Sequence, residues 1–185
     1  MTGDEPHYLI IADSIVRDRD LRVVNNYDEE AQRHAFIGAT ERHSQRFQYS
    51  VHNPAMPALI ALPFWLGGAT AAKVYLTLLM GLFPMLFFIT ARRRLAEVPA
   101  VVLALTLGLS MPYLTGAGQL FPDLMSGLFI LALVVLLGDG LDGARGPWRS
   151  ALFHLGLATL PWLHLKQLAP MAALEPRPEE TAPPA

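Results

Sequence analysis

The sequence predicts an all-α protein, a polytopic bundle of about four transmembrane helices preceded by a polar segment with short helices. Three observations lead to this fold class. First, 52% of the 185 residues are hydrophobic and only 16% are charged, whereas soluble domains carry about 25% charged residues. Second, the charges gather in residues 1–50 and in short connectors. Third, several apolar runs approach the roughly 20 residues that a helix needs to cross a bilayer.

Composition also excludes several classes of function. The formal net charge is −2, so no strong positive field favours a nucleic-acid partner. The chain contains no cysteine, which excludes disulfides, thiolate catalysis and zinc–thiolate sites. Chemistry is therefore expected from carboxylates, histidines and lysines, with the lipid bilayer as the expected surroundings.

The polar N-terminal part, residues 1–56, is expected to form an extracytoplasmic loop segment. Residues 7–16 have the apolar spacing of a short helix. Residues 21–48 are polar, of mixed charge and without clear periodicity, and are predicted to be a loop. The stretch "YSVHNPAMP" at residues 49–57 contains two prolines that interrupt regular structure.

Residues 57–170 form the predicted transmembrane region. Residues 57–66 are apolar but too short to span, and Gly67-Gly68 follows them, so we interpret them as an interfacial helix or a re-entrant segment. The four expected spans are 69–90, 98–114, 120–137 and 148–168. The remaining residues, 171–185, are rich in proline and glutamate and are predicted to be a disordered tail.

Basic residues in the short connectors predict the orientation of the spans. Arg92–Arg94 join the first and second spans, and Arg145 and Arg149 join the third and fourth. Both connectors are therefore expected on the cytoplasmic side. This places the remaining polar groups together on the opposite face: Asp4, Glu5, His7, His52, Gln119, Asp123, His164 and Lys166.

The carboxylates on that face allow two interpretations. Asp4 and Glu5 precede a helix, and Asp123 opens the third span, so all three suit the capping of free N–H groups and the helix dipole. They also suit general-base or metal-assisted chemistry on a hydroxyl. In the second interpretation Asp123 is a second acid across the site from Asp4.

The basic groups have a similar pair of interpretations. Lys166 follows an interfacial tryptophan, as a snorkelling lysine at a helix end does. Alternatively, Lys166 and His164 form an anion site for the phosphate of a lipid-linked substrate. His52 is a comparable candidate. His154 lies within an otherwise apolar span, and we expect a neighbouring helix to satisfy it.

The order of four segments gives a more specific indication. The segments "GDEPHYLIIADSIVRDRDLRVVNNY", "YSVHNPAMPALIALPFWLGG", "GQLFPDL" and "LPWLHLKQLAP" together resemble bacterial membrane glycosyltransferases of the GT-C superfamily. These enzymes are relatives of the protein O-mannosyltransferases and aminoarabinose transferases. The resemblance runs from about residue 3 to about residue 170. It implies a multi-pass protein of the bacterial plasma (inner) membrane that transfers a sugar from a polyprenyl-phosphate donor to a hydroxyl acceptor on the extracytoplasmic face.

The resemblance also implies roles for the candidate residues. Asp4, with Glu5 beside it, takes the place of the catalytic base or metal contact, and Asp123 takes that of a second acid. Lys166 and His164 take the place of the residues that hold the donor phosphate. His52 matches an outer-loop element and is assigned to substrate binding. No cofactor is certain, and a divalent metal is compatible with the carboxylates.

The chain departs from this family at both ends. The family has a transmembrane helix before the "GDEPHY" element and several helices after "LPWLH", so we interpret the chain as truncated, either an active relative or an inactive fragment. A non-catalytic integral membrane protein or subunit is the alternative. The enzyme hypothesis predicts that Asp4, Asp123 and Lys166 meet around a cavity, whereas the alternative predicts that they scatter. A small transporter would need ionisable residues deep in the spans, where only His154 was expected.

Overall fold

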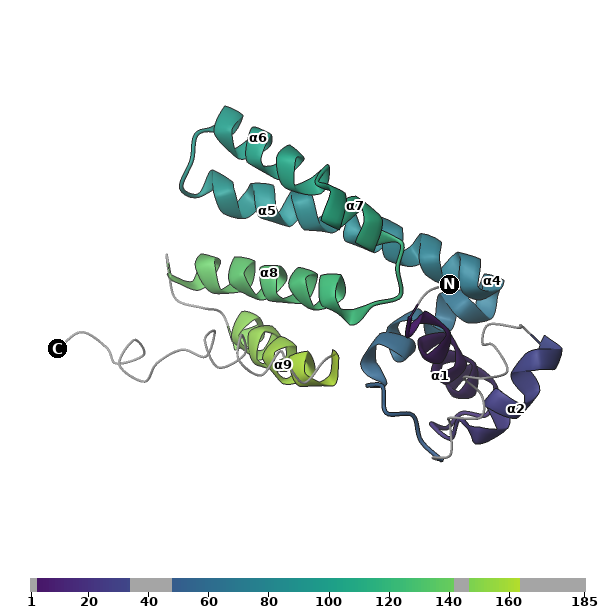
Figure 1. Ribbon diagram of the computed structural model, residues 1–185. Helices are drawn as coiled ribbons and strands as arrows, with labels where there is room; N and C mark the ends of the chain where they lie inside the picture. Colours follow the sequence, from purple (N-terminus) through teal and green to yellow (C-terminus); the bar gives the residue numbers. More distant parts are fainter. Residues whose placement is uncertain (1–2, 34–47, 142–146, 164–185) are drawn as a thin grey trace.

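The computed structural model describes residues 3–33, 48–141 and 147–163 (Figure 1). This described part is mostly helical and has no β-strand; an isolated antiparallel bridge joins Arg22 to Tyr49. The predicted all-α class is therefore confirmed for it. The helices are α1 (Glu5–Arg17), α2 (Val24–Arg33), α4 (Ala55–Met80), α5 (Leu82–Arg92), α6 (Glu97–Gly108), α7 (Met111–Ala117), α8 (Pro122–Leu141) and α9 (Pro147–Leu163).

Helix α1 confirms the short helix expected near the N-terminus. Pro6 lies in its first turn, where the missing N–H costs nothing, and Arg17 lies in its last turn, where a cation favours the dipole. The helix ends before Arg19, which has a positive φ of 59°. Residues on most of its circumference are buried, because α1 packs extensively on α4 and also contacts α2.

Helix α2 corrects the prediction of a loop over residues 21–48. Among the side chains that the structure describes, Tyr27 of α2 and Val23, directly before the helix, pack against Ile10 and Ile11 of α1. The helix is otherwise polar, so hydrophobic periodicity gave little indication of it. Residues 34–47 of the same expected loop lie outside the described part.

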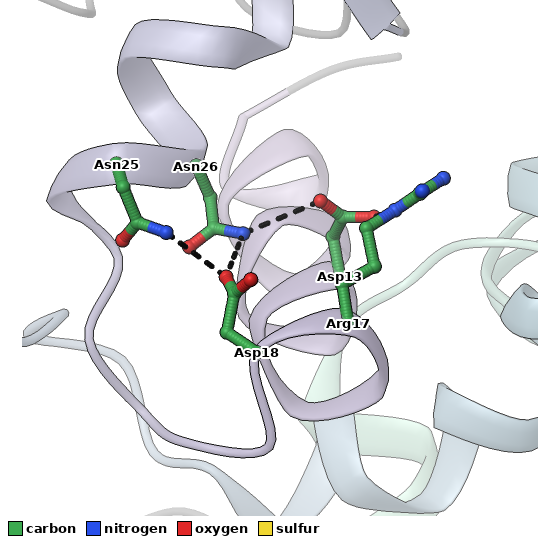
Figure 2. A network of polar contacts seen from close by, with 5 residues as sticks. All are labelled: Asp13, Arg17, Asp18, Asn25 and Asn26. Atoms are coloured by element: carbon green, nitrogen blue, oxygen red, sulfur yellow. Dashed lines mark hydrogen bonds and ion pairs between the residues drawn. The ribbon is translucent and has the colours of Figure 1, made fainter.

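A polar network fixes α2 against the C-terminal end of α1 (Figure 2). The Asn26 side-chain amide donates to Asp13 at 3.3 Å and to Asp18 at 2.8 Å. The Asn25 amide donates to the same Asp18 carboxylate at 3.0 Å, and Arg17 forms an ion pair with Asp13 at 2.5 Å. These charge-assisted bonds account for the ordered packing of a helix with so little apolar surface.

Helix α4 is broken where the sequence predicted a break. Gly67 and Gly68 have non-helical backbone angles, and the φ of Gly68 is +64°. Glycine adopts this conformation without the steric penalty that a Cβ brings. The apolar segment expected at residues 57–66 therefore forms the first part of α4, and the helix continues in a new direction after the kink.

The described residues include one helical segment, Ala55–Arg92, that is long and apolar enough to cross a membrane. α6 and α7 would form a second if this pair, bent by 57°, is one broken span. Residues 122–136 of α8 form a shorter apolar helix. The membrane assignment is thus supported at this coarser level, and the bundle of four spans stays a prediction.

The helices share one main core that runs from α1 through α4 to α8 and α9. α5 packs against α6 and against α8, and α9 packs against α8. Many apolar side chains nevertheless stay on the outside of α6 and α7, among them Val98 and Met111 with exposed fractions of 72% and 71%. The connector with Arg92–Arg94 lies at the opposite end of the α5–α6 pair from α1 (Figure 1). The expected placement of the arginine connector and the polar segment on different membrane faces stays a prediction.

Candidate functional site

Three of the predicted site residues lie near one tyrosine at the N-terminal end of α1. Asp4 immediately precedes α1, Tyr8 lies one turn into it, His52 belongs to the segment before α4, and Asp123 opens α8. Asp4 and Asp123 are exposed, His52 is half-buried and Tyr8 is buried. We call Asp4, His7, Tyr8, His52 and Asp123 the Tyr8 cluster. Its members come from three regions that are far apart in the sequence.

Ring contacts hold the aromatic members of the Tyr8 cluster together. The imidazoles of His7 and His52 are stacked, with centroids 5.1 Å apart and planes inclined by 23°. The Tyr8 ring is tilted against His52 at 5.2 Å. On its other side, His7 shares a hydrogen bond through Nδ1 with the Tyr27 hydroxyl of α2. His52 is therefore placed by α1, although it comes from another segment.

The electrostatics of Tyr8 link the two carboxylates. Burial, followed by the negative charges of Asp4 and Asp123, raises the pKa of Tyr8 to about 12. Both carboxylates therefore lie close enough to act on one phenol. A tyrosine with so high a pKa stays protonated near neutral pH, so its O–H is available as a hydrogen-bond donor beside the two acids.

His52 is held in its neutral form. Burial lowers the pKa of His52 below its usual 6.5; the Asp4 carboxylate opposes this effect, and the neighbouring His7 reinforces it. A neutral imidazole has one donor and one acceptor nitrogen. It can orient a hydroxyl without adding a positive charge next to Asp4.

The side chain of Asp4 does not cap α1. It makes no capping hydrogen bond, although the Asp4 carbonyl accepts from the backbone N–H of His7 and Tyr8. Its exposed carboxylate is therefore not occupied by the helix terminus. Of the two sequence-based interpretations of Asp4, the placement favours an acid that can meet a ligand.

Glu5 has a different environment from its neighbour. Its side chain is almost inaccessible, with 1% of the residue exposed. The carboxylate oxygens lie 3.0 Å from Lys73 Nζ of α4, and Oε1 accepts the Leu120 backbone N–H at 3.0 Å. This placement does not support the expected catalytic role of Glu5, because the hydroxyl of a sugar acceptor cannot reach the buried carboxylate.

Lys73 is a site-related residue that the sequence analysis missed. It lies inside Ala55–Arg92, the segment apolar enough to cross a membrane. Ionisable residues within such segments are usually functional or paired. The signal was therefore present, a lone lysine in an apolar run, but its partner in α1 could not be inferred.

His154, by contrast, does not need a neighbouring helix. It is exposed, and its Nδ1 lies 2.7 Å from the Ser150 carbonyl of the same helix. The expectation that an adjacent helix satisfies it is wrong, because a bond within α9 already does so.

His164 and Lys166 lie outside the described residues. The last described turn of α9 is tied to the segment that carries His52, since the Asn53 amide donates to the Pro161 carbonyl at 3.3 Å. The end of α9 and the Tyr8 cluster therefore lie on the same side of the protein. The predicted approach of Lys166 to Asp4 and Asp123 stays a prediction.

A small pocket adjoins His52. It is half-open, has a volume of about 80 Å³ and is lined by Ile11, Leu21, Tyr49, Ser50, His52 and Pro54. Sites for small molecules usually measure about 300–1,000 Å³. This pocket is large enough for a small polar group, and a whole sugar would need further walls.

The described residues do not offer a ligand set for the divalent metal that the resemblance allows. No three His, Asp or Glu side chains among them converge as a metal site requires. Asp4, His52 and Asp123 each influence Tyr8 but form no such group.

Comparison of the chain with protein families, with characterised proteins and with solved structures gives no match.

Proposed function

We propose that this chain is a membrane glycosyltransferase-like protein that transfers a sugar from a polyprenyl-phosphate donor to a hydroxyl acceptor. One arrangement carries the proposal: the hydrogen bond from the Leu120 N–H to Glu5 joins the segments that carry Asp4 and Asp123, and both carboxylates raise the pKa of Tyr8, whose ring lies against His52. The site adjoins a helical segment that is apolar enough to cross a membrane. A lipid-linked donor suits such a position, because its phosphate lies at the membrane surface.

In the proposed reaction Asp4 is the general base. Its exposed carboxylate accepts the proton of the acceptor hydroxyl as that oxygen attacks the anomeric carbon of the donor. The new carbon–oxygen bond forms while the bond from the anomeric carbon to the phosphate oxygen breaks, and polyprenyl phosphate leaves with the bonding pair. The abstracted proton stays on Asp4 until water removes it.

The other members of the Tyr8 cluster would orient the reactants. Neutral His52 and the protonated phenol of Tyr8 supply hydrogen bonds beside Asp4, and Asp123 supplies a negative charge near the developing positive charge of the sugar ring. The resemblance assigns the donor phosphate to His164 and Lys166. It also assigns the protein to the bacterial plasma membrane, with several spans and with Asp4 on the extracytoplasmic face.

The test is sugar transfer in membranes that contain the full chain. The probes are polyprenyl-phosphate donors with radiolabelled mannose or aminoarabinose, and the readout is labelled product. Asp4→Asn should reduce turnover by about 10²–10⁴-fold, the usual contribution of a general base. Asp28→Asn, at another exposed aspartate, is the matched control and should leave turnover unchanged.

A non-catalytic membrane protein or subunit is the second candidate. The small size of the pocket beside His52 and the structural ion pair of Glu5 favour it. This candidate is supported if the chain transfers sugar from none of the donors, or if Asp4→Asn transfers sugar as fast as the unaltered chain.

A further inference from the structure

The most deeply buried charged group in the described part of the chain is the carboxylate of Glu5, and the proposed chemistry does not use it. It belongs to a residue with 1% exposure, and Lys73, whose side chain is 33% exposed, lies 3.0 Å away. A buried ion pair has to recover a large desolvation cost.

Glu5 joins three separate elements. It belongs to the first turn of α1, its ionic partner Lys73 belongs to α4, and its second partner, the Leu120 N–H, belongs to the connection between α7 and α8. Leu120 itself has no exposed surface, so its N–H requires an acceptor within the protein. The Glu5 carboxylate therefore binds two other elements, α4 through the Lys73 ammonium and the α7–α8 connection through the Leu120 N–H.

The residues next to this junction belong to the Tyr8 cluster. Asp4 directly precedes Glu5, and Asp123 follows Leu120 by less than one helical turn. A second contact supports the same docking, since a Cβ added to Gly3 would lie only 3.3 Å from the Phe121 ring. A displacement of Glu5 from Leu120 would accordingly displace Asp4 from Asp123.

We infer that Glu5 and Lys73 are positioning residues, a buried ionic clamp that sets the distance between the Asp4 and Asp123 carboxylates. Lys73 fixes Glu5 on α4, and Glu5 in turn holds the α7–α8 connection through the Leu120 N–H. The role of the clamp in sugar transfer depends on the proposed function. The distance that the clamp sets between Asp4 and Asp123 does not depend on the proposed function.

The clamp can be tested by distance measurement, because the chain has no native cysteine. Nitroxide labels on Asp4→Cys and Asp123→Cys, in the full chain in lipid nanodiscs, report the separation by double electron–electron resonance. The clamp predicts one narrow distance distribution, kept in Lys73→Arg, which retains the cation. Lys73→Met and Glu5→Ala should give longer and broader distributions.

A double variant guards against simple misfolding. Lys73→Met removes the cation beside the buried Glu5 carboxylate, whereas Glu5→Gln combined with Lys73→Met removes both charges and keeps an acceptor for the Leu120 N–H. We expect the double variant to recover the melting temperature but only part of the narrow distribution. Arg17→Met, which breaks the ion pair at the far end of α1, is the matched control and should leave the distribution unaltered.

Two results would overturn the clamp. One is an unchanged narrow distribution in folded Lys73→Met and in folded Glu5→Ala. The other is equal broadening by Arg17→Met, which would show a general loosening of α1. If the chain transfers sugar, Lys73→Met should lower turnover by about a hundredfold, the loss that a misplacement of about 1 Å can produce, and Lys73→Arg should restore it. If Asp4→Asn leaves transfer unchanged, the proposed function fails while the distance result still stands.

Discussion

Tyr8 belongs to no sequence motif, yet three of the predicted site residues lie near it. Asp4, His52 and Asp123 were predicted from the sequence because carboxylates and histidines at helix starts and in outer loops are recognisable residue types. Tyr8 belongs to the short helix predicted over residues 7–16 and was not predicted as a site residue. Its position beside both acids depends on the docking of α1 against the start of α8, which no local pattern records. The pairing of Lys73 with Glu5 was unpredictable for the same reason. Helical spacing rules relate residues three or four apart, and these two residues lie in different helices.

The depressed pKa of His52 predicts a specific dependence of stability on pH. Because burial favours neutral His52 in the folded state, the unfolded state binds more protons below its ordinary pKa of about 6.5. Stability should therefore be complete above about pH 6.5 and decrease as the pH falls through the folded pKa of His52. Thermal unfolding followed by tryptophan fluorescence between pH 8 and pH 5 measures this decrease.

The comparison with His52→Gln isolates this group from the other histidines. The variant removes the titrating imidazole, so its melting temperature should fall less between pH 7 and pH 5 than that of the unaltered chain. An equal fall in both proteins would contradict a buried, neutral His52. His154→Gln, at an exposed histidine, is the control and should reproduce the unaltered pH dependence.

At the scale of elements, strong local signals were reliable and weak ones were not. α1 and the break in α4 were predicted because a run of apolar residues after Pro6 and a Gly-Gly pair have direct conformational consequences. α2 was missed because its packing against α1 depends on Val23 and Tyr27 together with the polar network of Figure 2. The number of spans is likewise not fixed by apolar length alone, since α6 and α7 are bent relative to each other.

The kink in α4 gives a prediction for Gly68. Its positive φ is accessible to glycine but strained for alanine, so Gly68→Ala should destabilise the fold by about 1–3 kcal/mol even though a Cβ would meet no atom within 4 Å. Gly127→Ala is the matched control, because Gly127 lies within α8 and an added Cβ would only make ordinary contact with Phe83 at 3.5 Å. Thermal unfolding in detergent compares the two, and equal stability would contradict the kink.

At the scale of the whole molecule, Asp4, His52 and Asp123 gather near Tyr8, and the convergence of Asp4, Asp123 and Lys166 around a cavity stays a prediction. The N-terminal end of α1 and the start of α8 lie away from the connector between α5 and α6, which carries Arg92–Arg94 (Figure 1). The sequence could predict this because basic connectors and alternating helix directions together assign each loop to an end. It could not predict which carboxylate would be buried, since that depends on packing between distant segments.

This arrangement predicts the sidedness of the chain in a membrane. Asp4→Cys and Asp123→Cys, each in the otherwise cysteine-free chain, should react with a membrane-impermeant maleimide from the same side of sealed vesicles. Arg93→Cys should react only from the other side. Labelling of Asp4→Cys and Asp123→Cys from opposite sides would contradict a shared site.

The contact between Glu5 and Leu120 also constrains the order in which the protein can be assembled. Glu5 leaves the ribosome before its backbone partner Leu120, which is synthesised more than a hundred residues later. Until then Glu5 of α1 can pair with Lys73 but lacks its hydrogen bond to the Leu120 N–H. Asp4 and Asp123 can therefore come together only after the α7–α8 connection has been synthesised. A nascent chain that stops before this connection would carry Asp4 without Asp123 beside it.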